Sequence, residues 1–490
     1  MEPAERGQEQ HRPNRLWGDA CLYERYAEQT LGTVTRFGTQ RITCLRGELM
    51  MKSFRIGRMT RIALTSAAVL AVSWAALPAQ AATGPVSSTP AAGTPQLAAT
   101  GTTEQVRQLA QCGGTMYAVG IFTMIQRSST TYTRNNAFSF SAASPFTVTS
   151  WNPNVNGTVD SVAFSPDCLE AYLGGEFTSV NGTAVHNIAE VSTSTGGVNI
   201  AFAHSANGEV ETLAASHGHL LAGGYFTSIN GSTNKYFVSL NPTTGRDDGY
   251  LELNISGNYG SGATSVHNQQ ISHGGTLDLA EGTFTSVGGQ PRQQIFMLSL
   301  GSTSATVTGW TSPEFSQPCV QNEAFYLRAA SWSPDDGTVY IATTGFHPLN
   351  APVDTELCDA AAAFSAGQTS QSHLWVNYTG CDSLYSTAAD SSLVYVGGHE
   401  RWADNQHGCN SPGPGSIPAQ GMAGLNPATG ALFLNSSGTA GFYTRARGLG
   451  ADDMLITSAG LWIASDNAQN SNQCGGVFGH AGICFLPYTG

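Results

Sequence analysis

The chain has 490 residues, with 34 acidic and 21 basic side chains, a formal net charge of −13 at pH 7 and ten cysteines. This length suits one large domain or two ordinary ones. The acidic balance argues against nucleic acid as a partner, because its phosphates would be repelled, whereas cations and neutral polymers are easier partners.

Residues 50–81 have the pattern of a secretory signal peptide. Four basic side chains lie within 52–61, an apolar stretch of 16 residues covers 62–77, and Ala79-Gln80-Ala81 is a small-residue cleavage motif. The alternative is a retained membrane anchor, but 16 residues are short for a bilayer span, which needs about 20. We therefore expect cleavage before Ala82, no membrane span afterwards, and a secreted, extracellular protein.

Two segments flank this signal peptide. A signal peptide starts at the initiator methionine, so we interpret residues 1–49 as an over-extended N-terminus. Residues 82–103 are small, rich in proline and nearly uncharged, which is typical of a flexible linker. Residues 1–81 hold 11 of the 21 basic and 7 of the 34 acidic side chains, which leaves the mature chain a formal charge of −17 and one lysine, Lys235.

One sequence unit recurs seven times after the linker. The best copies are YLGGEFTSVNG (172–182), LAGGYFTSING (221–231) and LAEGTFTSVGG (279–289), and weaker copies begin at 117, 340, 394 and 461. The points equivalent to the second glycine are Gly120, Gly175, Gly224, Gly282, Thr344, Gly398 and Ser465. Their spacing of 49–67 residues suits a four-stranded propeller blade and is too long for leucine-rich or ankyrin repeats.

The second unit shows how each repeat would fold. Four strands are expected in it, over 159–165, 170–177, 187–193 and 198–203, separated by turn motifs. The sequence therefore predicts an all-β fold, a seven-bladed β-propeller of four-stranded antiparallel blades over 104–490. We interpret the paired glycines as structural, because small residues are needed where neighbouring blades crowd together.

The seventh unit has only three clear strands. Its outer strand is missing from the sequence that precedes Gly490. We expect residues 95–100 to supply this strand and to close the ring by pairing the two ends of the chain.

The motif GGEFTSVNG, followed by an NIAEV strand and an NPTTG or NPATG turn, resembles the secreted actinobacterial propellers built of delta-sixty-type repeats. More distantly it is similar to the repeats of fungal Rax-like cortical polarity proteins. The block NYTGCDSLYSTAA, VYVGGHERWADN and GPGSIPAQGMAGLNPATG of unit six is close to one that the actinobacterial proteins share. The resemblance covers 104–488 and implies the propeller fold, in families whose biochemical role is mostly unknown.

Carboxylates recur near the start of the innermost strands. They are Asp160, Glu211, Asp382 and, in unit seven, Asp452 with Asp453. A ring of carboxylates around a channel mouth could hold Ca²⁺, which prefers several oxygen ligands. Solvated caps on strand ends are the alternative, which we favour because the chain contains no DxDxDG loop. No other cofactor is expected.

Unit six has the richest group of polar and aromatic side chains, and a histidine of unit five occupies a matching position. The group comprises Asp382, His399, Arg401, Trp402, Asp404 and His347. An indole stacks on a sugar ring while charged groups bond its hydroxyls, so these residues suit a glycan site. They could equally form an internal network in which Arg401 pairs with Asp404 or Asp382.

A catalytic alternative uses part of the same group. A polysaccharide lyase or glycosidase could combine His347, His399 and Asp382, with Arg401 neutralising a uronate. The chain has no GxSxG elbow, HExxH helix or other known catalytic motif. We therefore favour a secreted, monomeric, non-catalytic binding or scaffold propeller at the cell envelope, which recognises a glycan or protein through the loop face of blades five to seven.

Eight of the ten cysteines lie in the mature chain, an even number that favours disulfides in an exported protein. Loop positions in the repeat favour pairing within units, and one pair that joins units one and two. The pairs are Cys319 with Cys358, Cys381 with Cys409, Cys474 with Cys484, and Cys112 with Cys168. Eight cysteines allow 105 connectivities, so other pairings stay open.

Overall fold

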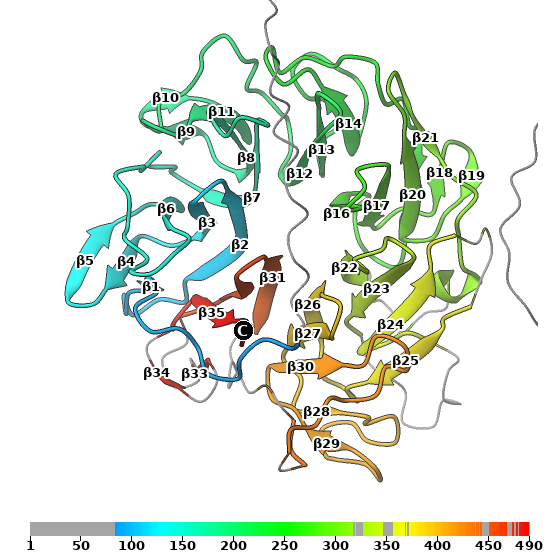
Figure 1. The fold of residues 1–490 in the computed structure, drawn as a ribbon. Helices are drawn as coiled ribbons and strands as arrows, with labels where there is room; N and C mark the ends of the chain where they lie inside the picture. The colour runs from blue at the N-terminus through cyan, green and yellow to red at the C-terminus, as the bar shows by residue number, and fades with distance from the viewer. Residues whose placement is uncertain are drawn as a thin grey trace, which may run out of the picture. The chain divides into compact units, whose positions relative to one another are not determined.

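Each repeat unit forms one antiparallel sheet, and the first strand of each sheet faces a common centre (Figure 1). The computed structural model describes residues 84–490 except 317–318, 320–326, 346–355, 368, 370–371, 437, 441, 443–449, 468–472, 475–476, 479 and 490. The proposed signal peptide and the segment before it lie outside this part of the chain, as does His347. The described residues all belong to one unit, 76–490.

Sheets one to three each have three strands. Sheet one is β2 (Gln105–Cys112), β3 (Thr115–Ile121) and β6 (Ala137–Ser141). Sheet two is β7 (Thr158–Phe164), β8 (Glu170–Glu176) and β11 (Ile188–Ser192). Sheet three is β12 (Val210–Ser216), β13 (His219–Gly224) and β14 (Phe237–Leu240).

Sheets four and five have four strands, and sheets six and seven have three. Sheet four is β16 (Val266–Ile271), β17 (Leu277–Gly282), β20 (Ile295–Leu300) and β21 (Ala305–Val307). Sheet five is β22 (Leu327–Trp332), β23 (Thr338–Thr343), β24 (Ala360–Ser365) and β25 (Trp375–Tyr378). Sheet six is β26 (Leu384–Ala389), β27 (Val394–Gly398) and β30 (Met422–Leu425), and sheet seven is β31 (Ala451–Thr457), β32 (Gly460–Ser465) and β35 (Ile483–Pro487).

Each of the loops that join second and third strands in sheets one, two, four, six and seven forms a short ladder, and β1 (Gln96–Leu97) and β15 (Ile255–Ser256) add a strand to two of these ladders. The ladders are β4 (Met124–Arg127) with β1 and β5 (Thr130–Thr133); β9 (Ser179–Val180) with β10 (Thr183–Ala184); β18 (Ser286–Val287) with β15 and β19 (Gln290–Pro291); β28 (Trp402–Ala403) with β29 (Ile417–Pro418); and β33 (Gln473–Cys474) with β34 (Val477–Phe478). Within the described ranges, the only helical element is the 3₁₀ turn η1 (Pro313–Ser316). No helix there is long and apolar enough to cross a membrane.

The first strands of consecutive sheets lie beside one another, from β2 through β7, β12, β16, β22 and β26 to β31. β31 in turn lies beside β2. A circular order of antiparallel sheets around their first strands is the arrangement of a β-propeller, so the prediction of an all-β propeller is confirmed.

The outer strand is weaker than the sequence predicted in several sheets. In sheets one, two, three and six it is reduced to a single bridge, such as Val191 with Val198 in sheet two. The expected strand 198–203 is broken because the Phe202 amide turns back to the Asn199 carbonyl at 3.2 Å. Ile200 next to it is 79% exposed, so little apolar burial favours extension of the strand.

The glycine motif provides close packing between sheets. A Cβ on Gly174 would lie 2.8 Å from Val210 of the next sheet, and one on Gly223 would lie 2.9 Å from the carbonyl oxygen of Val266 in the sheet that follows it. The strand register places Thr343, rather than Thr344, at the equivalent position of sheet five. The glycines are therefore structural, as the sequence indicated.

The segment before β2 is not a flexible linker. Val86 forms a bridge with Tyr488, and the amides of Ser87 and Ala91 donate to carbonyls of β35. The two ends of the chain thus pair as expected, but residues 86–91 lie along β35, whereas Leu97 of the expected segment 95–100 makes one bond, to the Ala481 carbonyl at 2.8 Å. Val86 and Leu97 are almost fully buried, and this apolar burial holds the segment in place.

Candidate functional site

Every first strand contains a β-bulge near its start, at the same position of the repeat. The strand register shifts by one residue there, and the extra residues are Arg107, Asp160, Glu211, His267, Arg328, Tyr385 and Asp452. A bulge re-aims the side chain of its extra residue. All seven side chains, with Gln105, line one cavity of about 280 Å³ where the first strands begin. We call this set of seven residues the channel ring.

Three of the five predicted carboxylates meet in the channel ring. Asp160, Glu211 and Asp452 line the cavity, whereas Asp382 lies elsewhere because it precedes the bulge position and binds Arg401. The Arg107 guanidinium donates to Asp160 at 2.5 Å. Across the described residues, no group of three histidine, cysteine or acidic side chains is placed to hold a metal ion. The carboxylates considered from sequence as calcium ligands are therefore not all gathered in one place, since Asp382 lies outside the channel ring.

Burial sets the protonation of the channel ring. It raises the pKa of Asp452 to about 8 and, together with Glu209 and Asp160, that of Glu211 well above its usual range. Burial and the Arg328 charge lower the pKa of His267 to about 3. Near neutral pH the ring therefore contains a neutral imidazole and protonated carboxyl groups, which can both donate and accept hydrogen bonds.

Three carboxyl oxygens of the channel ring have unused hydrogen-bonding capacity. Asp160 Oδ2, Glu211 Oε2 and Asp452 Oδ2 are buried and have no hydrogen-bond partner among the described residues. All three residues line the cavity. Buried polar atoms are normally satisfied, so these oxygens indicate a place where solvent or a ligand binds.

The positions that follow the bulges join neighbouring sheets. Gln108 Oε1 accepts the Val162 amide of sheet two at 2.6 Å, and Asp453 Oδ2 accepts the Leu109 amide of sheet one at 2.8 Å. Both side chains line the deeper part of the channel. These bonds fix the first strands relative to one another, so the channel ring is held by a rigid frame.

Glu281 is a buried carboxyl next to the channel that sequence reasoning missed. It is fully buried, and the Asn268 amide donates to its Oε2 at 3.0 Å. Burial raises its pKa to about 8. The signal was present in the sequence, since Glu281 replaces the first glycine of the motif in LAEGTF. In the next sheet, Ala330 occupies the repeat position that Leu213 occupies in sheet three. Because alanine is smaller than leucine, it leaves space for the Glu281 carboxyl group.

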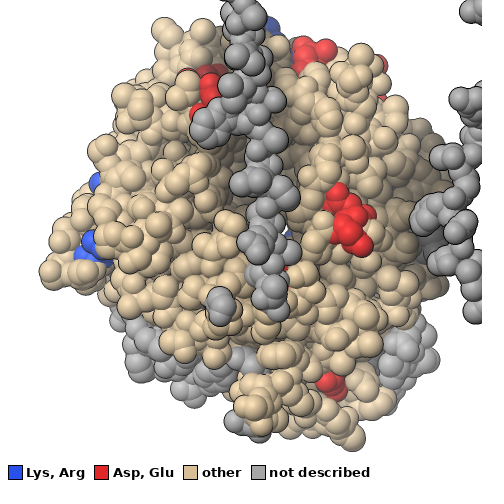
Figure 2. Space-filling model, in the orientation of Figure 1, with Lys and Arg blue, Asp and Glu red and all other residues tan. Residues whose placement is uncertain are grey.

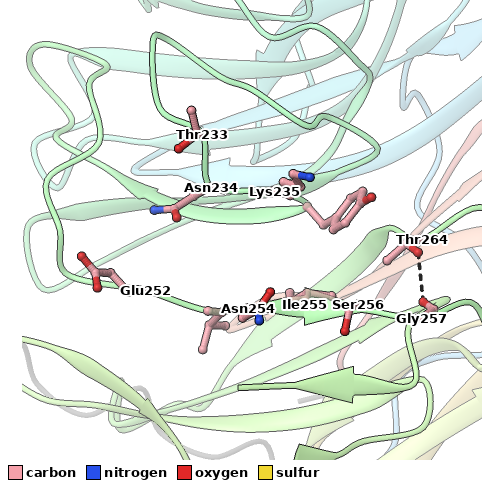
Figure 3. A pocket seen from close by; sticks show the side chains of 11 residues that line it. Thr233, Asn234, Lys235, Glu252, Asn254, Ile255, Ser256, Gly257 and Thr264 are labelled. Carbon is pink, nitrogen blue, oxygen red and sulfur yellow. Dashed lines mark hydrogen bonds between the residues drawn. The ribbon is translucent and has the colours of Figure 1, made fainter. Parts of the chain in front are cut away.

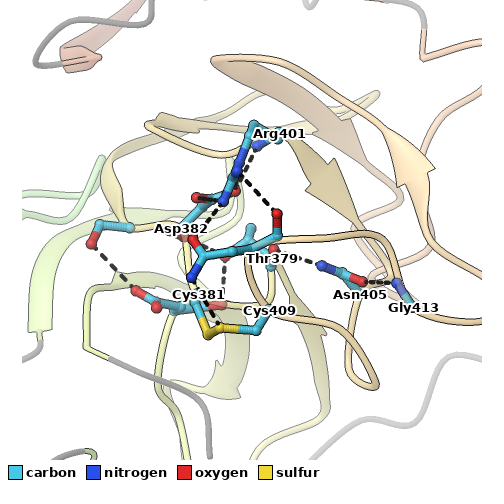
Figure 4. Close-up of a disulfide and its surroundings, with 10 residues drawn as sticks. Thr379, Cys381, Asp382, Arg401, Asn405, Cys409 and Gly413 are labelled. Atoms are coloured by element: carbon cyan, nitrogen blue, oxygen red, sulfur yellow. Dashed lines mark hydrogen bonds and ion pairs between the residues drawn. A yellow bond between two sulfur atoms is a disulfide. The ribbon is translucent and has the colours of Figure 1, made fainter. Parts of the chain in front are cut away.

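The polar group of unit six forms an internal network (Figure 4). Arg401 makes two hydrogen bonds with Asp382, at 2.7 and 2.6 Å, and a third and fourth with Asn410. Its guanidinium lies 4.5 Å from the centre of the Trp402 ring. This geometry corresponds to the structural interpretation, with Asp382 as the partner of Arg401. Because the two charges neutralise each other, neither is presented to a substrate as the catalytic alternative requires.

The remaining candidates of unit six separate from this network. The Asn377 amide donates to Asp404 at 2.7 Å. His399 Nδ1 lies 3.1 Å from the Tyr385 hydroxyl, and thus next to the channel ring. His399 therefore contacts the channel ring through Tyr385, and Asp404 is not part of either group.

The structure contains four disulfides, with the pairing that the repeat positions favoured. They join Cys112 to Cys168, Cys319 to Cys358, Cys381 to Cys409 and Cys474 to Cys484. The Cys381–Cys409 bond lies directly beside the Asp382–Arg401 pair (Figure 4). It therefore closes the loop whose Asn410 carbonyl also binds Arg401.

No family model and no curated protein matches the chain. Among solved structures, it is similar to U3-55K, with a TM-score of 0.46 and 10% identity over 81% of this chain and 100% of that one. It is also similar to the WD40 β-propeller domain of Doa1 (TM-score 0.39, 11% identity, 76% of this chain and 94% of that one) and to the WD40 repeats of RRP9 (0.42, 9%, 80% and 99%). Similarity at this level carries no argument about function.

Proposed function

We propose that the chain is a secreted, non-catalytic propeller that binds a glycan at the cell envelope, on the face where the channel ring opens. The observation that carries this proposal is the convergence of seven polar side chains on one cavity. Arginine and tyrosine supply donors, and the carboxyl groups of Glu211 and Asp452 supply both donors and acceptors. A sugar presents hydroxyl groups that both donate and accept, so it suits such a mixed ring better than a simple ion does.

The size of the opening supports a glycan in preference to a protein. A cavity of about 280 Å³ is close to the lower end of small-ligand sites, which start near about 300 Å³. A protein partner needs a broad surface with an apolar core. The neighbouring deeper channel is lined mainly by polar residues, which would bind ordered water or hydroxyl groups.

Export is supported by two independent features. The sequence over 50–81 has the signal-peptide pattern, and four disulfides are usual in an oxidising compartment. We further propose membership of the actinobacterial family of delta-sixty-type repeats, on the motifs of units two, three and six. The exported protein would begin at Ala82 and act outside the cell as a monomer.

We also propose that the seven sheets are seven four-stranded blades. The single bridges in sheets one, two, three and six lie where a fourth strand would pair, and Val86 supplies the corresponding bridge of sheet seven. In this scheme the network of unit six braces the loop face of blades five to seven. The contact between His399 and Tyr385 connects that face to the channel ring.

A glycan array on the purified protein tests the proposal. We expect binding of a defined glycan class, weakened at least tenfold by Glu211→Ala or Asp452→Ala, because each change removes a carboxyl group at the cavity. Asp167→Ala, in the turn at the other end of β7, is the matched control and should bind normally. Equal binding by all four proteins would overturn the assignment of the site.

Product analysis on each bound glycan separates binding from catalysis. We expect the glycan to remain intact. Bond cleavage that disappears in His399→Ala would instead establish the carbohydrate-active enzyme considered from sequence.

A further inference from the structure

Two open grooves flank the loop of sheet three that joins β13 to β14. The first has a volume of about 600 Å³ and is lined by Glu176, Asn187, Glu209 and Tyr225, among others. The second has a volume of about 550 Å³ (Figure 3). Lys235, Tyr236, Glu252 and Asn254 are among its lining residues.

The two grooves lie in the gaps before and after sheet three, and their tyrosines stand at different positions of the repeat. The first lies between the loop after β8 and the approach to β12, and the second lies between the loop after β13 and the approach to β16. Tyr225 and Tyr236 are the first and last residues of the same loop, so one loop contributes a tyrosine to each groove. The amide of Tyr236 donates to the Phe226 carbonyl at 2.9 Å, and that of Tyr225 to the Glu209 carbonyl at 3.0 Å. These bonds hold the tyrosines at a fixed separation.

The grooves also share their chemistry. Each contains one half-buried tyrosine, at least one carboxylate and several amide or hydroxyl groups. A tyrosine ring packs against the apolar face of a sugar, while carboxylates and amides bind its hydroxyl groups. The same set repeated in successive grooves suits a ligand that is itself built of repeating units.

The charge of the grooves limits the ligand further. The two linings contain three acidic side chains, Glu176, Glu209 and Glu252, and a single basic one, Lys235. Most of the face drawn in Figure 2 is uncharged, and its acidic side chains are scattered. A polysaccharide that carries uronate or sulfate groups would be repelled, whereas a neutral or amine-bearing one would not.

The first groove adjoins the channel ring. Burial is the main cause that raises the pKa of Glu209 to about 7, and the nearby charge of Asp160 adds to it. Burial and the charge of Glu211, a member of the channel ring, raise the pKa of Tyr225. Glu211 Oε2 is one of the buried carboxyl oxygens that lack a hydrogen-bond partner in the described part of the chain. A chain seated in the first groove would therefore end beside the channel opening.

We propose that a linear, non-acidic polysaccharide lies across sheet three, with sugar units of the same chain in both grooves. The inference rests on the proposed glycan function and adds the architecture and charge class of the ligand. Two linked grooves bind a long chain more tightly than a short one, because the second contact is intramolecular once the first has formed. Such linkage raises affinity by about 10² or more when the geometry allows both contacts.

The experiment is calorimetric titration of the full protein with β-1,4-linked oligomers of N-acetylglucosamine and of glucose, from about two to about eight units. Tetra- to octagalacturonate is the acidic counterpart. We expect affinity to rise at least tenfold at one chain length and then to level off. Glu252→Ala with Asn254→Ala, both at exposed positions, should remove this rise, whereas Asp167→Ala, which lines neither groove, should retain it.

Three outcomes would overturn the inference. Short oligomers that bind with an affinity independent of chain length would leave the proposed glycan function standing but exclude a two-groove ligand. A length-dependent rise that persists in the Glu252→Ala, Asn254→Ala variant would place the second contact elsewhere. Galacturonate binding as tight as that of the neutral oligomers would show that the grooves do not select against acidic chains. Failure of every oligomer and of the glycan array would instead refute the proposed function itself.

Discussion

Replacement of Glu281 by glutamine should stabilise the protein in a pH-dependent manner. The carboxyl group is fully buried, and burial raises its pKa from 4.5 to about 8. Between these values the folded state binds a proton that the unfolded state has released, so stability falls as pH rises through this window. The difference of about 3.5 units corresponds to a loss of about 5 kcal/mol above pH 8, of which about 3 kcal/mol is present at pH 7.

Glutamine cannot ionise, and its carbonyl can still accept the hydrogen bond from Asn268. We therefore expect Glu281→Gln and the unchanged protein to be similarly stable near pH 4, with the variant more stable by up to about 3 kcal/mol at pH 7. Urea unfolding followed by tryptophan fluorescence at both pH values measures this gap. The same difference at pH 4 and pH 8.5 would refute the reasoning, because ionisation of Glu281 would then not oppose folding.

Asp335→Asn provides a control of opposite sign. Hydrogen bonds from Ser333 and Gly337 lower the pKa of this carboxyl group. Its contribution to stability is present above its unfolded pKa and is lost as pH falls. The variant should therefore be less stable than the unchanged protein near neutral pH, with a gap that disappears in acid.

Three further predictions concern the frame of the site and its export. Removing the Cys112–Cys168 bond, which spans 56 residues, by serine substitution should lower the unfolding free energy by about 4 kcal/mol, and a reducing agent should then have less effect. Arg401→Met should lower it by about 3–5 kcal/mol by leaving Asp382 buried without its partner, and Asp382→Asn in the same chain should recover most of the loss. Mass spectrometry of the exported protein should give a chain that begins at Ala82.

Each of these predictions can fail in a distinct way. Equal urea midpoints for the serine variant and the oxidised protein would show that the bond does not constrain the unfolded chain. An Arg401→Met protein as stable as the unchanged one would show that water takes the place of Arg401 at the Asp382 carboxylate. A retained segment before Ala82 would favour the membrane anchor over a cleaved signal.

Much of the propeller could be predicted from sequence because its repeat is local. The motif GGxFT is complete in units two and three, where steric crowding at Gly174 and Gly223 leaves a direct trace in the chain. The disulfide pairs followed in the same way from the positions of loops in the repeat. The prediction of a flexible linker was wrong, since burial of Val86 and Leu97 depends on contacts with the far end of the chain.

The candidate site was harder to predict. The channel ring depends on a one-residue bulge, which moves a side chain to the axis without altering the apolar alternation that reveals a strand. A polar residue after the first apolar one of each inner strand, as in Val-Asp at 159–160 and Val-Glu at 210–211, was the available signal. Unit six looked more distinctive because of Arg401 and Trp402. Its composition could not reveal that Asp382 satisfies the arginine.

A crystal structure of the protein with the tightest glycan from the array tests the central claim most directly. The account predicts sugar hydroxyl groups within hydrogen-bonding distance of Glu211 or Asp452 at the channel ring, with the chain continuing into the groove beside Tyr225. Sugar bound only at the opposite ends of the first strands, near the turn that contains Asp167, would contradict it.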